Sequence, residues 1–182
     1  MKWLKKKFKK LKWFEIVSTW FGLGYFPVMP GTIGSLGAFP LFYFAVMSSS
    51  TIEEAKNTML VFVVFLTFIG LFAISKFHRL TRIIDDSRIV IDEVIGQLVT
   101  LIIAYEGIGN VASSLFKLDD SQPSLKVLFA IFIVAFIPFR FCDITKPFYI
   151  SLIDRYWRNS LGVIMDDILA GILAALPFLF FR

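Results

Sequence analysis

Three short stretches of the sequence combine acidic and basic residues in patterns that suit phosphate chemistry. They read IDEVIGQ at 91–97, RFCDITKP at 140–147 and MDDILAG at 165–171. Their charged residues are Asp92, Glu93, Arg140, Asp143, Lys146, Asp166 and Asp167. Facing carboxylates bind Mg²⁺ through oxygen ligands, and a bound metal can activate water and neutralise phosphoryl charge. Arginine and lysine can hold the phosphate oxygens.

A fourth stretch, PGTIGS at 30–35, is typical of a turn that holds phosphate. Gly31 and Gly34 lack the steric limits of a Cβ atom, and the proline fixes φ, so successive N–H groups can converge on an anion where a helix begins. Thr32 and Ser35 add hydroxyl donors. The alternative is a Pro/Gly turn that only caps a helix.

The composition places these motifs in a membrane protein. The chain has 182 residues, of which 57% are hydrophobic and 22 are Phe, and its mean hydropathy is +0.75. These values exceed what a soluble domain of this size needs for its core. We predict one membrane-embedded domain over residues 1–182 with an all-α, polytopic fold. The net charge of +5 lies mainly beside apolar segments, which indicates anionic lipid rather than nucleic acid as the partner.

Apolar runs predict about five membrane helices, of which four or five cross the bilayer. Their approximate ranges are Thr32–Met47, Thr58–Lys76, Ile89–Tyr105, Leu125–Phe141 and Gly162–Phe181. The first is short enough to be re-entrant instead of spanning. Residues 1–21 place Leu4, Phe8, Leu11 and Phe14 at helical spacing among seven lysines. This pattern predicts an amphipathic helix that lies on an anionic membrane surface.

Segment lengths place both acid pairs at the membrane boundary. The third segment reaches a spanning length of about 20 residues only if Asp92 and Glu93 are included, and the fifth only if Asp166 and Asp167 lie in its first turns. If all five segments cross, the four motifs share one side. Carboxylates at that depth are costly unless they face a cavity, a cation or a partner, so a functional site is the default interpretation.

The placement of the four motifs on one side of the membrane also predicts the orientation of the chain, and the spacing within the motifs suggests how the helices pack. Fifteen of the 19 Lys and Arg residues fall on the motif side, which the positive-inside rule makes cytoplasmic. Glu93 and Gln97 share a helix face at i, i+4 spacing. Gly96 and Gly171 remove side chains where helices could approach closely.

Two other interpretations stay open at this point. The acids and bases could form structural salt bridges between helices, although such pairing does not explain two adjacent-acid motifs beside a Gly/Thr/Ser turn. The chain could also be a small cation- or proton-coupled transporter, which would distribute its carboxylates across the membrane depth. Cys142 and His78 are the only residues of their types. We interpret them as packing and interfacial residues because neither has the partners that cysteine or histidine phosphatase chemistry requires.

The motifs PGTIGS, IVIDEVIGQ, FRFCDITKP and GVIMDDILAG, in this order, resemble those of the phosphatidylglycerophosphatase A family. The resemblance covers about residues 22–175 and implies a Mg²⁺-dependent phosphatase of the bacterial inner membrane. Such an enzyme removes the terminal phosphate of phosphatidylglycerophosphate to give phosphatidylglycerol, in glycerophospholipid biosynthesis. When the motifs are matched one by one, the resemblance implies that the family's acidic residues correspond to Asp92, Glu93, Asp143, Asp166 and Asp167. Cys142, Thr145 and Phe148 depart from the family pattern without removing a charge.

We therefore expect a cytoplasm-facing site whose substrate is a phospholipid in the bilayer. The residues expected to hold one or two Mg²⁺ ions are Asp92, Glu93, Asp166 and Asp167. Asp143 is expected to be a further ligand or the general base. The residues expected to contact phosphate are Gly31, Thr32, Gly34, Ser35, Arg140 and Lys146. The sequence does not distinguish direct water attack from an aspartyl-phosphate intermediate, and it does not fix the oligomeric state.

Overall fold

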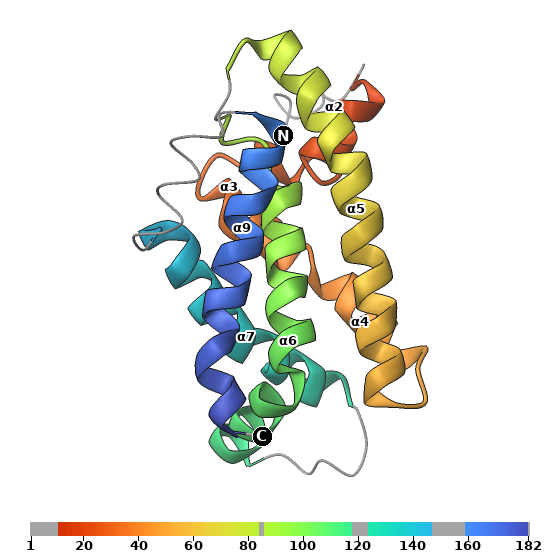
Figure 1. The fold of residues 1–182 in the computed structure, drawn as a ribbon, viewed down its shortest axis with the longest axis vertical. Coiled ribbons are helices and arrows are strands. Elements are labelled where there is room, and N and C mark those ends of the chain that lie inside the picture. The colour runs from red at the N-terminus through yellow and green to blue at the C-terminus, as the bar shows by residue number, and fades with distance from the viewer. Residues whose placement is uncertain (1–10, 84–85, 118–123, 147–158, 182) are drawn as a thin grey trace.

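The computed structural model describes residues 11–83, 86–117, 124–146 and 159–181, and every regular element among them is a helix (Figure 1). In chain order these are α2 (Trp13–Ser18), η2 (Leu23–Tyr25), α3 (Pro30–Leu36), α4 (Phe39–Met47), α5 (Ile52–Thr81), α6 (Ile91–Phe116), α7 (Leu125–Thr145), α9 (Ser160–Ala175) and η3 (Leu176–Phe181). The predicted all-α class is confirmed.

Within the residues that the structure describes, five helical stretches are long and apolar enough to cross a membrane, as predicted. They are Pro30–Met47, Ile52–Thr81, Ile91–Phe116, Leu125–Thr145 and Ser160–Phe181. Several helix ends differ from the predicted limits, since α5 is longer at both ends and α6 continues through most of the predicted link after Tyr105. The apolar run marks where lipid ends, whereas the hydrogen-bonded backbone of a helix can continue into polar sequence.

The first of these stretches is divided into two helices. α3 ends at Leu36 and α4 begins at Phe39, with Gly37 and Ala38 in a turn between them. Pro40 has no N–H to donate to the carbonyl four residues earlier, which weakens the ladder at this point. The break separates α3, which packs against α6 beside the predicted site, from α4.

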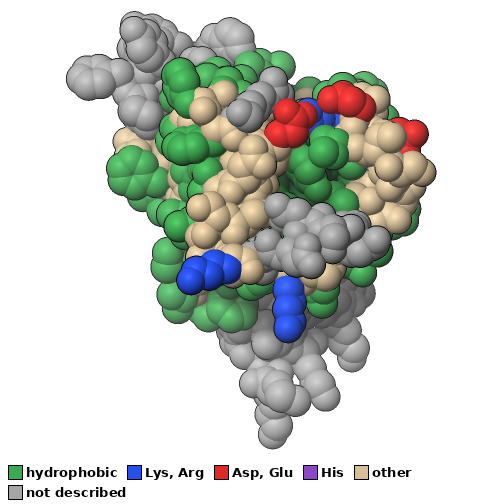
Figure 2. Space-filling model, turned by 90° about the horizontal axis from the view of Figure 1, so that it is seen from below, with side chains coloured by type: hydrophobic (Ala, Val, Ile, Leu, Met, Phe, Trp, Pro, Cys, Tyr) green, Lys and Arg blue, Asp and Glu red, His purple; other side chains and the backbone are tan. Residues whose placement is uncertain are grey.

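α6 is the central helix of the bundle. It packs against α9, α7, α5 and α3, and in Figure 1 it runs downward beside α9 while α5 runs the other way. Figure 2 shows the molecule from below, with acidic and basic side chains of both signs on this end and apolar side chains around the flanks. The outward face of α5 is apolar over several turns, with exposed Leu60, Val61, Val64, Phe65, Phe68 and Phe72. Such a surface suits contact with lipid chains.

The N-terminal region is only partly described, because residues 1–10 of the predicted amphipathic helix lie outside the described residues. The described part forms the six-residue α2, which packs against α5. The helix stops at Ser18, and Trp20 and Phe21 take left-handed φ values of 46° and 57°. The prediction of a helix through residue 21 is therefore wrong at its C-terminal end. The Val90 N–H donates to the Ser18 carbonyl at 2.9 Å, so this turn is tied to the start of α6.

Candidate active site

The first turn of α6 carries the first acid pair. Asp92 and Glu93 are its second and third residues, and the Asp92 side chain is buried. Backbone N–H groups at a helix N-terminus point toward this end, and their partial positive charge favours carboxylates there. The start of α6 thus offers a local reason why two buried acids are tolerated.

The second turn of α9 carries the second acid pair. The helix starts at Ser160, where the Asn159 side chain accepts a hydrogen bond from the Gly162 N–H at 2.9 Å. Asp166 and Asp167 are both buried, but adjacent residues on a helix point about 100° apart. Asp167 therefore faces α6, whereas Asp166 forms an ion pair with Lys146 at the end of α7.

Three carboxylates from the two helices converge. One ligand oxygen each from Asp92, Glu93 and Asp167 lie within 4.8 Å of one another. The convergence depends on a close helix crossing: a Cβ on Gly96 would lie 2.5 Å from the Asp167 carbonyl oxygen, and one on Gly171 would collide with the Gly96 carbonyl. The predicted role of these glycines in helix approach is confirmed.

The last turn of α7 brings the basic residues to the same place. Pro138, two residues before Arg140, has no N–H to donate to the hydrogen-bond ladder of the helix. Arg140 forms an ion pair with Asp143, and its Nη1 lies 4.0 Å from Glu93 Oε1. Lys146 ends the helix with a left-handed φ of 41°, a conformation that is costly for a residue with a Cβ. The terminal turn is therefore shaped to present two cations to the acids of α6 and α9.

The PGTIGS stretch makes up all of α3 except Leu36, and its residues contribute unequally to the site. The Ser35 hydroxyl donates to the Gly31 carbonyl at 2.9 Å and accepts from Arg140 Nη1 at 3.3 Å. A Cβ on Gly31 would collide with Glu93 Oε1, so this glycine lets α3 lie against the acids. Gly34 instead packs against Val90, where an added Cβ would lie 2.5 Å from the valine Cβ. Its predicted phosphate contact therefore has no direct geometric support.

The charges in this site do not cancel. The two close ion pairs engage Asp143 and Asp166, and Glu93 has only the longer contact with Arg140 at 4.0 Å. Among the described residues, Asp92 and Asp167 form no ion pair with a lysine or arginine. One buried oxygen of each, Asp92 Oδ1, Glu93 Oε2 and Asp167 Oδ2, has no hydrogen-bond partner within the described chain. Structural salt bridges therefore explain only part of the cluster.

This donor set fits a hard divalent cation. All the converging groups are carboxylate oxygens, which Mg²⁺ prefers, and a buried anion without a partner is costly. Asp143 lies close enough to interact electrostatically with Asp92, Glu93 and Asp167. Three of the four predicted metal ligands thus form one cluster, with Asp143 at its edge. Asp166 lies beside it, paired with Lys146.

Two features around the site had no role assigned to them from the sequence. Gln97 is fully buried one turn below Glu93, and its i, i+4 spacing was the signal available. The segment before α6 is held by Asp86, which accepts from Arg88 Nε at 2.7 Å. Burial alone would raise the pKa of Asp86, but the hydrogen bonds and charge of Arg88 outweigh it and lower this pKa below its ordinary value. His78 interacts electrostatically with Asp86.

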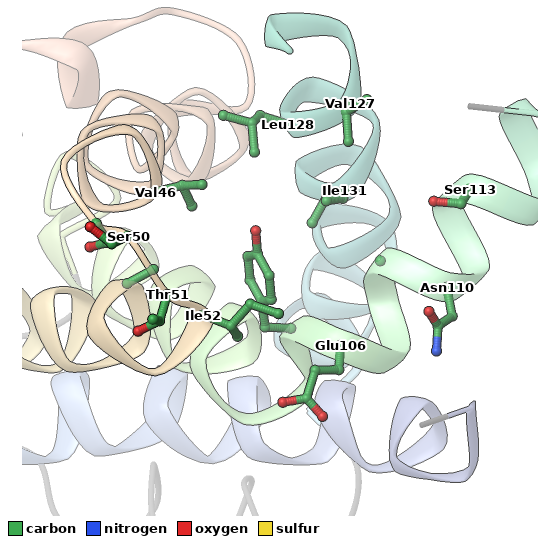
Figure 3. Close-up of a pocket in the computed structure, with 14 residues that line it drawn as sticks. Val46, Ser50, Thr51, Ile52, Glu106, Asn110, Ser113, Val127, Leu128 and Ile131 are labelled. Carbon is green, nitrogen blue, oxygen red and sulfur yellow. The ribbon is translucent and has the colours of Figure 1, made fainter. Parts of the chain in front are cut away.

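A cavity of about 340 Å³ lies among α4, α5, α6 and α7, away from the carboxylate cluster (Figure 3). Tyr105 and Glu106 line it just past Ala104, where α6 departs from helical geometry with φ −120° and ψ 20°. Glu106 accepts from Lys56 Nζ at 2.8 Å. The residues predicted for the site are not among those that line this cavity, so the cavity is separate from the candidate active site.

The fold and the site define a polytopic helical membrane protein with a buried carboxylate cluster flanked by arginine and lysine at one end of its bundle. A profile of the family described as Phosphatidylglycerophosphatase A matches residues 16–182, and the chain belongs to that family. The resemblance seen in the four motifs is thereby confirmed.

Individual relatives agree with this assignment. The chain is 28% identical to phosphatidylglycerophosphatase A of Escherichia coli (strain K12) over 172 residues, covering 94% of this chain and 84% of the relative. It is 29% identical over 171 residues to the Haemophilus influenzae protein of the same name, covering 94% and 90%. A Bacteroides thetaiotaomicron protein provisionally named phosphatidylinositol-3-phosphatase is 29% identical over 157 residues, or 86% of each chain. No solved structure matches the chain significantly.

Proposed function

We propose that this protein is a Mg²⁺-dependent phosphatidylglycerophosphatase, a phosphoric monoester hydrolase of the bacterial inner membrane. The observation that carries the proposal is the buried cluster of Asp92, Glu93 and Asp167 beside Arg140 and Lys146. A phosphate recognised at the end of an apolar bundle, on a molecule that stays in the bilayer, is a lipid phosphate. The family and the names of two relatives support phosphatidylglycerophosphate as that lipid.

The acidic and basic residues of the site have different roles in this proposal. Asp92, Glu93 and Asp167 would hold the cation, which when bound neutralises phosphoryl charge and activates water. Lys146 is 34% exposed, against 13% for Arg140, so Lys146 is the first cation that an arriving phosphate meets. Lys146 and Arg140 would each exchange part of their contact with a carboxylate for contact with phosphate oxygens. Their positive charges would stabilise the negative charge that develops on those oxygens.

Asp143 and Asp166 have supporting roles in this proposal. Asp143 pairs with Arg140 and interacts electrostatically with Asp167 of the carboxylate cluster. From there it can orient the guanidinium and accept a proton from water, or add a further ligand oxygen. Asp166 holds Lys146 at the end of α7. Its additional role as a metal ligand stays a prediction.

Phosphate release tests the proposal directly. Purified protein in detergent should release phosphate from phosphatidylglycerophosphate with Mg²⁺ and stop when a chelator is in excess. Phosphatidylinositol 3-phosphate should be offered in parallel, because one relative carries that substrate in its name. Full turnover in chelator would refute the cation requirement, and hydrolysis of only the inositol lipid would refute the substrate. Cation transport into vesicles without phosphate release would favour the transporter alternative.

We also propose that the site faces the cytoplasm. The excess of basic residues on the motif side supports this orientation. A reporter fused after Arg182 should then be periplasmic, since five crossings follow a cytoplasmic N-terminus. A cytoplasmic reporter would mean that one stretch does not cross, and the divided stretch Pro30–Met47 would be examined first.

A further inference from the structure

Gln97 is a polar side chain that the site, as described so far, does not use. It lies on α6 one helical turn deeper than Glu93 and on the same face. Its side chain is 0% exposed, and neither Nε2 nor Oε1 has a hydrogen-bond partner in the described part of the chain. A buried amide with neither group paired is unfavourable, and such a group in a native protein calls for an explanation.

The surroundings of Gln97 contrast with those of the next polar residue on α6. Thr100 is also fully buried, but its hydroxyl lies 3.1 Å from the Gly171 carbonyl oxygen and 3.2 Å from that of Gly96. Thr100 therefore has partners within the helix crossing. Gln97 instead shares its helix face with Glu93, whose Oε2 is likewise buried and unpaired.

A hydrogen-bond donor and an acceptor that both lack partners thus lie one turn apart on one helix. The amide of Gln97 offers two N–H groups, and the Glu93 carboxylate accepts only. A carboxylate ligand of a metal is usually held by a second hydrogen bond from the protein, which fixes its orientation.

We propose that Gln97 is a positioning residue of the cation site. Neither its amide nor Glu93 Oε2 is paired in this structure, and when Glu93 binds the cation the Gln97 amide turns to donate a hydrogen bond to Oε2 and fixes the carboxylate. The inference rests on the proposed function, because it assumes that Glu93 is a ligand. Loss of such an outer partner typically weakens metal affinity by about 10–100-fold. The amide itself does not contact the substrate.

Cation affinity measured without substrate tests this role. Mn²⁺ binding to the purified full-length protein in detergent can be followed by calorimetry and by the electron paramagnetic resonance of free Mn²⁺. Gln97→Met keeps an unbranched side chain of similar length but removes the amide, and it should weaken Mn²⁺ binding by about 10–100-fold. Its thermal stability without metal should equal or exceed that of the wild type, because no buried amide remains unpaired. Gln97→Leu provides a second apolar variant should the methionine protein fail to fold.

Thr100→Val is the matched control, since it also removes a buried polar group from the core face of α6. Its Mn²⁺ affinity should be that of the wild type, although its stability should fall because two carbonyl contacts are lost. Gln97→Met protein that binds Mn²⁺ as tightly as the wild type would overturn the role of Gln97 alone. Wild-type protein that binds no divalent cation would overturn the proposed metal site as well.

Discussion

Replacing Gly31 with alanine should separate activity from stability. The glycine is the second residue of α3, and its backbone is not in the left-handed region, so alanine can adopt the same conformation. Alanine is favoured over glycine in a helix by about 1 kcal/mol. The fold should therefore be as stable as the wild type or slightly more stable.

The added methyl group nevertheless collides with the site. It would overlap Glu93 Oε1 and lie 3.2 Å from Arg140 Nη2, and both are ends of flexible side chains that can move aside. The carboxylate must yield by about 1 Å, and a misplacement of that size can cost on the order of 10²-fold in rate. We expect a loss of about that size in kcat/KM for phosphatidylglycerophosphate, with an unchanged or raised melting temperature.

Gly109→Ala is the matched control for this experiment. Gly109 also lies within a helix, α6. A Cβ added there would meet no side chain and no backbone of another element within 4 Å. Phosphate release and thermal unfolding should be measured for both variants and the wild type. A Gly31→Ala protein as active as Gly109→Ala would refute the placement of α3 against Glu93.

Three further predictions follow from the site and from the segment before it. Asp92→Asn and Asp167→Asn should abolish most phosphate release while circular dichroism shows intact helices, and an active variant of either would remove that residue from the cation site. Lys146→Ala should slow turnover by about 10²–10³-fold, by analogy with loss of one transition-state donor. Excess Mg²⁺ should not restore it, and restoration would mean that Lys146 acts through the metal. Asp86→Asn should destabilise the protein at pH 7 by about 1.5–3 kcal/mol, the range for a hydrogen bond to a charged group. Because the pKa of Asp86 is lowered by Arg88, its contribution is complete above the unfolded pKa of about 3.9 and is lost as pH falls through the folded value. Thermal unfolding should therefore show the variant and the wild type converging in strong acid, and a constant difference would contradict the ion pair.

The sequence sufficed to place the four motifs together, for a simple reason. Successive crossings alternate in direction, so the start of α6, the end of α7 and the start of α9 must share one end of the bundle. Glycine at 96 and 171 also indicated where helices could approach, because the absence of a side chain is visible in the sequence itself.

The sequence did not suffice to assign a partner to each acid. Whether Asp166 or Asp167 faces α6 depends on the rotation of α9 about its axis, which tertiary packing sets. The ion pair between Lys146 and Asp166 depends in turn on the left-handed end of α7. The length of α6 was also misjudged, since hydropathy reports the thickness of the bilayer rather than the end of a helix.

The backbone contact between Gly96 and Gly171 divides the protein into a static part and a part that can move. α6 and α9 cannot slide or part without losing this contact, so Asp92, Glu93 and Asp167 travel as one rigid body. Room for an arriving lipid must then come from α3, which is seven residues long, and from the turn of α7 beyond Pro138. Hydrogen exchange should slow in those two segments when a substrate analogue binds, and remain unchanged along α6 and α9.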